Sequence, residues 1–119
     1  MITREQQTLV FFENQGGVLV RARVLDLQPT KKDDTGYLAL GDLDADGDVD
    51  AAVTVTEKGE VRIYRNQGGA GSFVEPAARE VIHLGGGPLG IDSGDLNGDG
   101  RRDLVVGNLE SRSLHVLLG

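Results

Sequence analysis

The sequence has no cysteine, few aromatic residues and no stretch with the periodicity of an amphipathic helix. Without cysteine, the chain has neither a disulfide framework nor a thiolate metal site. Aromatic residues make up only 4% of the chain, but the hydrophobic fraction of 39% is enough for a packed core. The 18 glycines suit short strands joined by many turns. The composition therefore favours an all-β domain.

Positive charge is scarce as well. The 119 residues include 12 Lys and Arg against 19 Asp and Glu, which gives a formal net charge of −7. Nucleic acids and anionic membrane surfaces both require a basic footprint, so the charge argues against them as partners. Residues 1–15 contain no apolar run long enough for a signal peptide or a membrane span. We expect either a fragment without its leader or a chain that is not exported.

The parts of a catalytic site are missing. The two histidines, His83 and His115, stand in apolar segments, and no serine has a Gly-x-Ser-x-Gly context. The glycine-rich segment 85–90 lacks the Lys and the Ser or Thr of a phosphate-binding loop and reads as a connector. We therefore predict that the chain is not an enzyme and has no catalytic residues.

The most informative feature is a pair of acidic loops. The first contains Asp42, Asp44, Asp46 and Asp50, with Gly47 between the last two. The four carboxylates would repel one another without a cation between them. The second repeats the spacing 53 residues later, with Asp95, Asn97, Asp99, Gly100 and Asp103. Hard oxygen donors at alternate positions, followed by a glycine that permits a sharp turn, are typical of the start of a calcium loop.

These loops differ from an EF-hand. That motif needs a bidentate Glu at the twelfth loop position and a helix on each side. The twelfth positions here are Val53 and Val106, which have no side-chain ligand, and the last acid falls at position nine. The segments that follow, "DAAVTV" and "DLVVG", are rich in β-branched residues, so each loop is expected to join two strands.

A second motif shows that the whole chain is a repeat. The segment "VRIYRNQGG" at 61–69 matches "LVFFENQGG" at 9–17 with a period of 52, which agrees with the period of the acidic loops. Strands are expected before and after each acidic loop and at 61–64. Further strands are expected at 8–14, 18–27 and 72–84. This gives nine strands in all, the last of which ends at "LHVLLG".

The segments "YLALGDLDADGDVDAAVTV" and "PLGIDSGDLNGDGRRDLVVGNLESRSLHVLLG" resemble the FG-GAP or VCBS repeat of integrin-α-type β-propellers. The resemblance implies Ca²⁺ between the first and second strands of a propeller blade, two ions per chain, with a structural role. The implied ligands of the first ion are the side chains of Asp42, Asp44, Asp46 and Asp50 and the carbonyl of Asp48. Those of the second ion are the side chains of Asp95, Asn97, Asp99 and Asp103 and the carbonyl of Arg101. We expect weaker binding at the second loop, because Asn97 replaces an acid and Arg101 and Arg102 add positive charge.

The resemblance also implies a division of the chain into four-stranded antiparallel blades. Residues 8–35 would be the last strands of one blade, 36–87 a complete blade with the loop 42–50, and 88–119 the first strands of the next blade with the loop 95–103. Two blades need eight strands, so one strand is surplus. Because a blade buries its faces only against its neighbours, the chain is either cut from a longer propeller or completed by copies of itself. Three copies in a head-to-tail homo-oligomer are favoured, and four are the alternative.

The resemblance implies a calcium-binding module that acts in ligand binding and adhesion, or as a self-assembling scaffold. Its ligand would be a protein or a carbohydrate, and its location extracellular or periplasmic. The alternative is an accessory fragment, carbohydrate-binding or structural, of a larger secreted enzyme. A minimal propeller built to test ring assembly is a weaker alternative, since the two copies differ at many positions.

Overall fold

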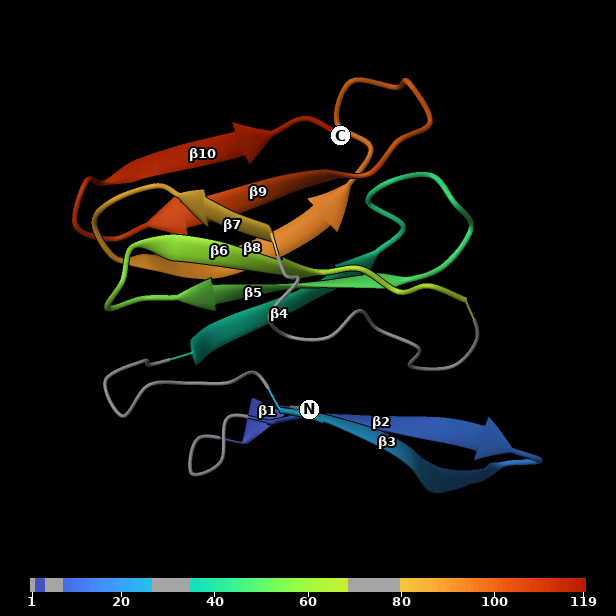
Figure 1. Ribbon diagram of the computed structural model, residues 1–119. Coiled ribbons are helices and arrows are strands. Elements are labelled where there is room, and N and C mark those ends of the chain that lie inside the picture. Colours follow the sequence, from blue (N-terminus) through green and yellow to red (C-terminus); the bar gives the residue numbers. More distant parts are fainter. Residues whose placement is uncertain (1, 4–7, 27–34, 69–79) are drawn as a thin grey trace.

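The computed structural model describes residues 2–3, 8–26, 35–68 and 80–119. These residues form ten strands in three sheets and no helix, and every pair of neighbouring strands is antiparallel (Figure 1). The prediction of an all-β fold is confirmed. The described part of the chain contains no helix that is long and apolar enough to cross a lipid bilayer.

The first sheet has the order β1-β2-β3, with β1 at Ile2–Thr3, β2 at Thr8–Gln15 and β3 at Val18–Asp26. The β2–β3 hairpin turns at Gly16 and Gly17, which both have positive φ, and the Gly17 amide donates to Asn14 Oδ1 at 2.8 Å. The strand β1 is the tenth strand and corrects the predicted count of nine. A strand of two residues carries no alternation of polar and apolar side chains, so the sequence gives no signal for it.

The middle sheet has the order β4-β5-β6-β7. Its strands are β4 at Thr35–Gly41, β5 at Asp50–Val55, β6 at Glu60–Tyr64 and β7 at Glu80–His83. Every residue of β5 and β6 is buried, because both faces of the sheet are covered. This explains why "DAAVTV" does not alternate between apolar and polar residues. Of the strand expected at 72–84, residues 72–79 lie outside the described residues.

The third sheet has the order β8-β9-β10, with β8 at Pro88–Gly94, β9 at Asp103–Asn108 and β10 at Ser113–Leu117. Figure 1 shows the three sheets stacked, with the sheet β4–β7 between the other two. Hydroxyl groups fasten the third sheet to the middle one. Thr54 Oγ1 donates to the carbonyl of Leu89 and Thr56 Oγ1 to that of Pro88, both at 2.9 Å, and Ser93 Oγ donates to the carbonyl of Leu40 at 2.6 Å.

Two apolar layers fill the spaces between the sheets, and they repeat one another in sequence. The first layer joins Leu9 and Phe11 of the first sheet to Leu38, Ala51, Val53 and Tyr64 of the middle sheet. The second layer joins Ala39, Ala52, Val61 and Ile63 of the middle sheet to Ile91, Leu104, Val106 and Leu117 of the third. A shift of 53 residues converts the middle-sheet members of the first layer into the third-sheet members of the second. The same packing is therefore used twice.

Candidate metal centre

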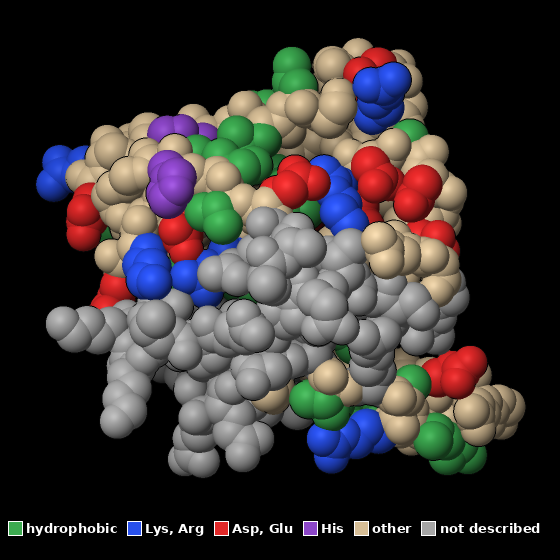
Figure 2. All heavy atoms as spheres, in the orientation of Figure 1, with side chains coloured by type: hydrophobic (Ala, Val, Ile, Leu, Met, Phe, Trp, Pro, Cys, Tyr) green, Lys and Arg blue, Asp and Glu red, His purple; other side chains and the backbone are tan. Residues whose placement is uncertain are grey.

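The first acidic loop, residues 42–49, connects β4 to β5. It brings oxygen atoms of Asp42, Asp44 and Asp50 within 4.8 Å of one another. The second loop, residues 95–102, connects β8 to β9 at the same end of the stack (Figure 1). Acidic side chains gather at this end of the molecule (Figure 2).

Backbone amides of the first loop hold its carboxylates in place. Asp42 accepts from the amides of Asp46 and Gly47, at 3.1 Å and 2.9 Å. Asp44 accepts from the amide of Asp46 at 3.3 Å, and Asp46 accepts from the amide of Asp48 at 2.9 Å. The acids at positions one, three and five therefore orient the backbone that follows them, and the loop folds back on its own side chains.

The second loop repeats these hydrogen bonds and adds one, from the amide of Gly98 to Asp95 Oδ1 at 2.7 Å. Asp95 accepts from the amides of Asp99 and Gly100, at 3.1 Å and 2.8 Å, as Asp42 does in the first loop. Asn97 Oδ1 accepts from the amide of Asp99 at 3.2 Å, and Asp99 accepts from the amide of Arg101 at 2.9 Å. The amide oxygen of Asn97 thus takes the place of the Asp44 carboxylate without a change in the fold of the loop.

The acid at position nine anchors each loop to the body of its sheet. Asp50 and Asp103 have no exposed surface, although they are charged residues. Their Oδ2 atoms accept from the amide at position two, Leu43 at 2.9 Å and Leu96 at 2.8 Å. Their Oδ1 atoms accept from a backbone amide 16 residues further along the chain. These donors are the amides of Asn66 at 2.9 Å and Gly119 at 2.8 Å.

Position four of both loops has a left-handed backbone, which glycine adopts more easily than alanine. Ala45 has φ of 64° in the first loop, whereas the second loop has Gly98 with φ of 75°. No heavy atom lies within 4 Å of the place where a Cβ on Gly98 would be, so the left-handed backbone, and not a lack of space, favours glycine at this position.

We expect Ala45→Gly to stabilise the protein by about 0.5–1 kcal/mol, because relief of the left-handed strain exceeds the entropy that glycine adds to the unfolded chain. Gly98→Ala should destabilise it by about the same amount. Urea denaturation of both variants beside the wild type checks the pair. Destabilisation by Ala45→Gly would contradict the assigned backbone conformation.

Desolvation, hydrogen bonds and nearby charges shift three pKa values around the two loops. Partial desolvation, and then the nearby charge of Asp50, raise the pKa of Asp44. Hydrogen bonds from the amides of Gly119 and Leu96 lower the pKa of Asp103 despite its desolvation. Desolvation lowers the pKa of Arg65, but hydrogen bonds and charges from Glu80 and Asp50 outweigh it, so the pKa is raised. The first loop thus contains carboxylates whose mutual repulsion a cation would relieve.

The donor set fits a hard divalent cation. The side chains that converge in the first loop, and those at the same positions of the second loop, all offer oxygen, the ligand atom that Ca²⁺ and Mg²⁺ prefer. Asp46, the fourth predicted side-chain ligand of the first loop, is not among the three acids whose oxygens converge, and it accepts from the amide of Asp48. In the second loop Asn97 stands at position three, and its Nδ2 donates to Asp99 Oδ2 at 3.3 Å. Three of the four side chains predicted for the first ion therefore lie together.

The sequence interpretation missed four residues that support these sites. Asn66 and Gly119 donate to the position-nine acids, and Asn66 was visible only as part of the repeated "NQGG" turn. Arg65 Nη1 lies 3.2 Å from Asp50 Oδ2 and binds Glu80 as well. No ligand-like spacing marks these residues, because they approach the loops only through strand pairing. Pairing of β5 with β6 brings Arg65 and Asn66 to Asp50, pairing of β6 with β7 brings Glu80 to Arg65, and pairing of β9 with β10 brings Gly119 to Asp103.

Comparison with known protein families gives one match. Residues 42–106, more than half of the chain, match the model of the FG-GAP-like repeat. The match begins at the first acid of the first loop and ends within β9, after the second loop. No curated protein and no solved structure matches the chain significantly.

Proposed function

The chain belongs to the FG-GAP-like repeat family, and on that premise we propose that it is a calcium-binding β-propeller module whose metal ions are structural. The resemblance found in the sequence is thereby confirmed at the level of the family. The observation that carries the proposal is the agreement of the two loops, 53 residues apart, in their hydrogen-bond networks. Two copies of one oxygen-lined loop, each seated on a buried Asp, are what two equivalent cation sites require.

The three stacked sheets support the propeller reading. Each sheet is antiparallel, each interface repeats the packing of the one before, and the middle sheet has four strands, as a propeller blade does. On this reading β4–β7 is a complete blade. The sheets β1–β3 and β8–β10 are incomplete ones, and both metal loops lie at the same end of their sheets.

The ions would be held by the residues that the family resemblance assigns. In the first loop these are the side chains of Asp42, Asp44, Asp46 and Asp50 with the carbonyl of Asp48. In the second loop they are Asp95, Asn97, Asp99 and Asp103 with the carbonyl of Arg101. Calcium would contribute positive charge between carboxylates that repel one another. A structural rather than catalytic role is supported by the many protein oxygens, which leave little room for an open coordination position.

We expect the chain to bind two Ca²⁺ ions with dissociation constants of about 10⁻⁴ to 10⁻³ M, the range of extracellular modules. A titration followed by the backbone amide NMR signals of Gly47 and Gly100 reads the two loops separately. Asp46→Ala should remove the response of Gly47 and leave that of Gly100, and the matched variant Asp99→Ala should do the reverse. Unchanged signals for both glycines up to 10 mM Ca²⁺ would contradict the proposal.

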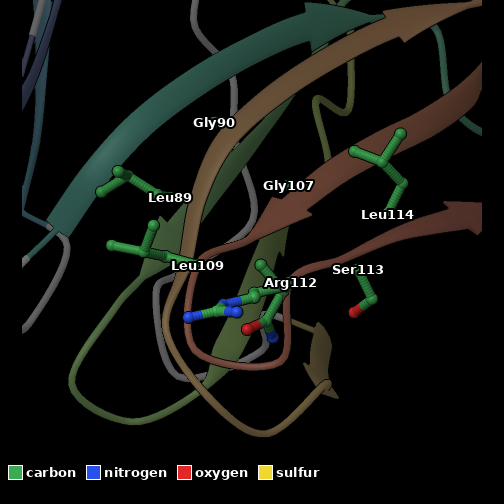
Figure 3. A pocket seen from close by; sticks show the side chains of 8 residues that line it. Leu89, Gly90, Gly107, Leu109, Arg112, Ser113 and Leu114 are labelled. Atoms are coloured by element: carbon green, nitrogen blue, oxygen red, sulfur yellow. The ribbon is translucent and has the colours of Figure 1, made fainter.

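The outer faces of the stack support a role in assembly. Leu114 and Val116 of β10 are the repeat equivalents of Val61 and Ile63, which are buried against the third sheet. Leu114 is 75% exposed, and it borders a shallow pocket of about 370 Å³ that also includes Leu89 and Leu109 (Figure 3). The first sheet exposes Phe12, Val18, Leu19, Val20 and Val24.

We propose that these two apolar end faces are covered by copies of the same chain in a head-to-tail homo-oligomer. Exposed apolar patches of this kind mark interaction sites, and the internal packing already shows which residue pattern fits against which. A ring of this type would present its loops for binding a protein or carbohydrate ligand, in adhesion or as a scaffold. FG-GAP repeats are typically extracellular, and the proposed calcium affinity suits an extracellular or periplasmic setting.

A further inference from the structure

Arg65 joins the first acidic loop to the outermost strand of its sheet. It follows β6 directly, and its Nη1 donates to Asp50 Oδ2 at 3.2 Å. Its other nitrogens bind Glu80 of β7, with Nε 2.8 Å from Oε1 and Nη2 3.3 Å from Oε2. The Arg65 side chain is 23% exposed, that of Glu80 53%, and that of Asp50 not at all. One guanidinium is therefore shared between a buried and an exposed carboxylate.

The shared carboxylate of Asp50 is also one of the three whose oxygens converge in the loop. A buried carboxylate needs a positive charge or several hydrogen bonds to offset its lost hydration. Arg65 supplies that charge, and a bound cation would supply it as well. Two positive groups that approach the same carboxylate repel each other, so each weakens the binding of the other.

The second loop lacks this arrangement and so provides an internal comparison. The repeat equivalent of Arg65 is Leu118, which is 65% exposed. Asp103 accepts from the amides of Leu96 and Gly119, and no Lys or Arg of the described ranges forms an ion pair with it. The two position-nine acids thus have equivalent backbone donors in their own repeats, but only Asp50 also has a cationic side chain as a partner.

We propose that Arg65 is a built-in counterion of the first loop, which keeps the loop folded without metal and lowers its calcium affinity. This inference rests on the proposed calcium-binding function. Arg65 neutralises Asp50 in the metal-free loop, and Glu80 holds the guanidinium when Asp50 turns its charge to the metal. The larger number of acids in the first loop raises its calcium affinity, whereas the charge of Arg65 lowers it. The number of acids alone therefore overstates the difference in calcium affinity between the two loops.

The first test removes the charge of Arg65. In Arg65→Gln, the calcium dissociation constant read from the Gly47 amide should fall roughly tenfold, the order expected when a unit charge is removed a few ångströms from a divalent ion. The value read from Gly100 should stay unchanged. Arg65→Lys retains the charge and should stay within about threefold of the wild type. An unchanged or higher dissociation constant for Gly47 in Arg65→Gln would overturn the proposal.

The second test installs the charge where it is absent. Leu118→Arg changes an exposed side chain, so it should fold even if Arg65→Gln does not fold without calcium. The dissociation constant read from Gly100 should rise roughly tenfold, and that from Gly47 should not move. An unchanged Gly100 value would overturn the proposal. If the wild type itself binds no calcium, the proposed function fails and the inference with it. If the wild type binds two ions but either variant leaves the dissociation constant of its own loop unchanged, the inference alone fails.

Discussion

Replacing Asp50 by alanine should lower the free energy of unfolding by about 3–5 kcal/mol, even in chelator. The Asp50 carboxylate is completely buried and accepts three hydrogen bonds, from the amides of Leu43 and Asn66 and from Arg65. Hydrogen bonds to charged groups contribute about 1.5–3 kcal/mol each, and buried donors left without an acceptor add a desolvation cost. The effect is not fully additive, because the three donors share one carboxylate.

Asp46→Ala is the matched control for this experiment. Asp46 belongs to the same loop and carries the same charge, but it is exposed and accepts a hydrogen bond from the amide of Asp48. It should cost less than about 1 kcal/mol in chelator. Urea denaturation of both variants, with and without calcium, separates the anchoring of the loop from metal binding. If Asp50→Ala unfolds at the same urea concentration as Asp46→Ala in chelator, the anchoring role of Asp50 is refuted.

Much of the local structure could be predicted from the sequence, because the hydrogen bonds that shape each loop join residues close together in the sequence. The alternate acids and the glycine at position six determine a turn that closes through side chain to backbone hydrogen bonds within nine residues. The strand after each loop is marked by β-branched residues, and β5 begins and ends where "DAAVTV" does. The repeat of 52–53 residues then links the two halves of the chain without any structural knowledge.

What the sequence could not supply depends on contacts between distant segments. Arg65 looks like an ordinary surface charge until β5 pairs with β6 and sets it beside Asp50. The same pairing brings Asn66 to Asp50, and the pairing of β9 with β10 brings Gly119 to Asp103. The side chains of Asn66 and Gly119 have nothing in common, because the backbone amide is the donor. The strand β1 forms only because β2 provides a partner for it. Local patterns predict local hydrogen bonds, and pairing between strands decides the rest.

The second large effect concerns assembly. Light scattering coupled to size exclusion in millimolar calcium should give a discrete mass above the 12.6 kDa of one chain. Leu114→Lys should reduce it to that of one chain, because the charge would be buried in the apolar contact that we propose for the outer face of β8–β10. Ser111→Lys, which adds the same charge in the exposed β9–β10 turn, should leave the mass unchanged. A wild-type mass of one chain in calcium and in chelator alike would contradict self-assembly.

The value of the mass also decides how the end sheets meet. The strands β2, β6 and β10 are repeat equivalents, so a blade made by merging β8–β10 of one copy with β2–β3 of the next contains that strand twice. Merging must therefore displace β2 or β10. It gives two blades per chain, and a ring of three or four copies. Stacking the intact end sheets face to face displaces no strand and reaches six sheets with two copies. We expect three copies if the free energy gained by adding a fourth strand to the third sheet exceeds the free energy lost when β2 or β10 leaves its own sheet. We expect two copies if the loss exceeds the gain.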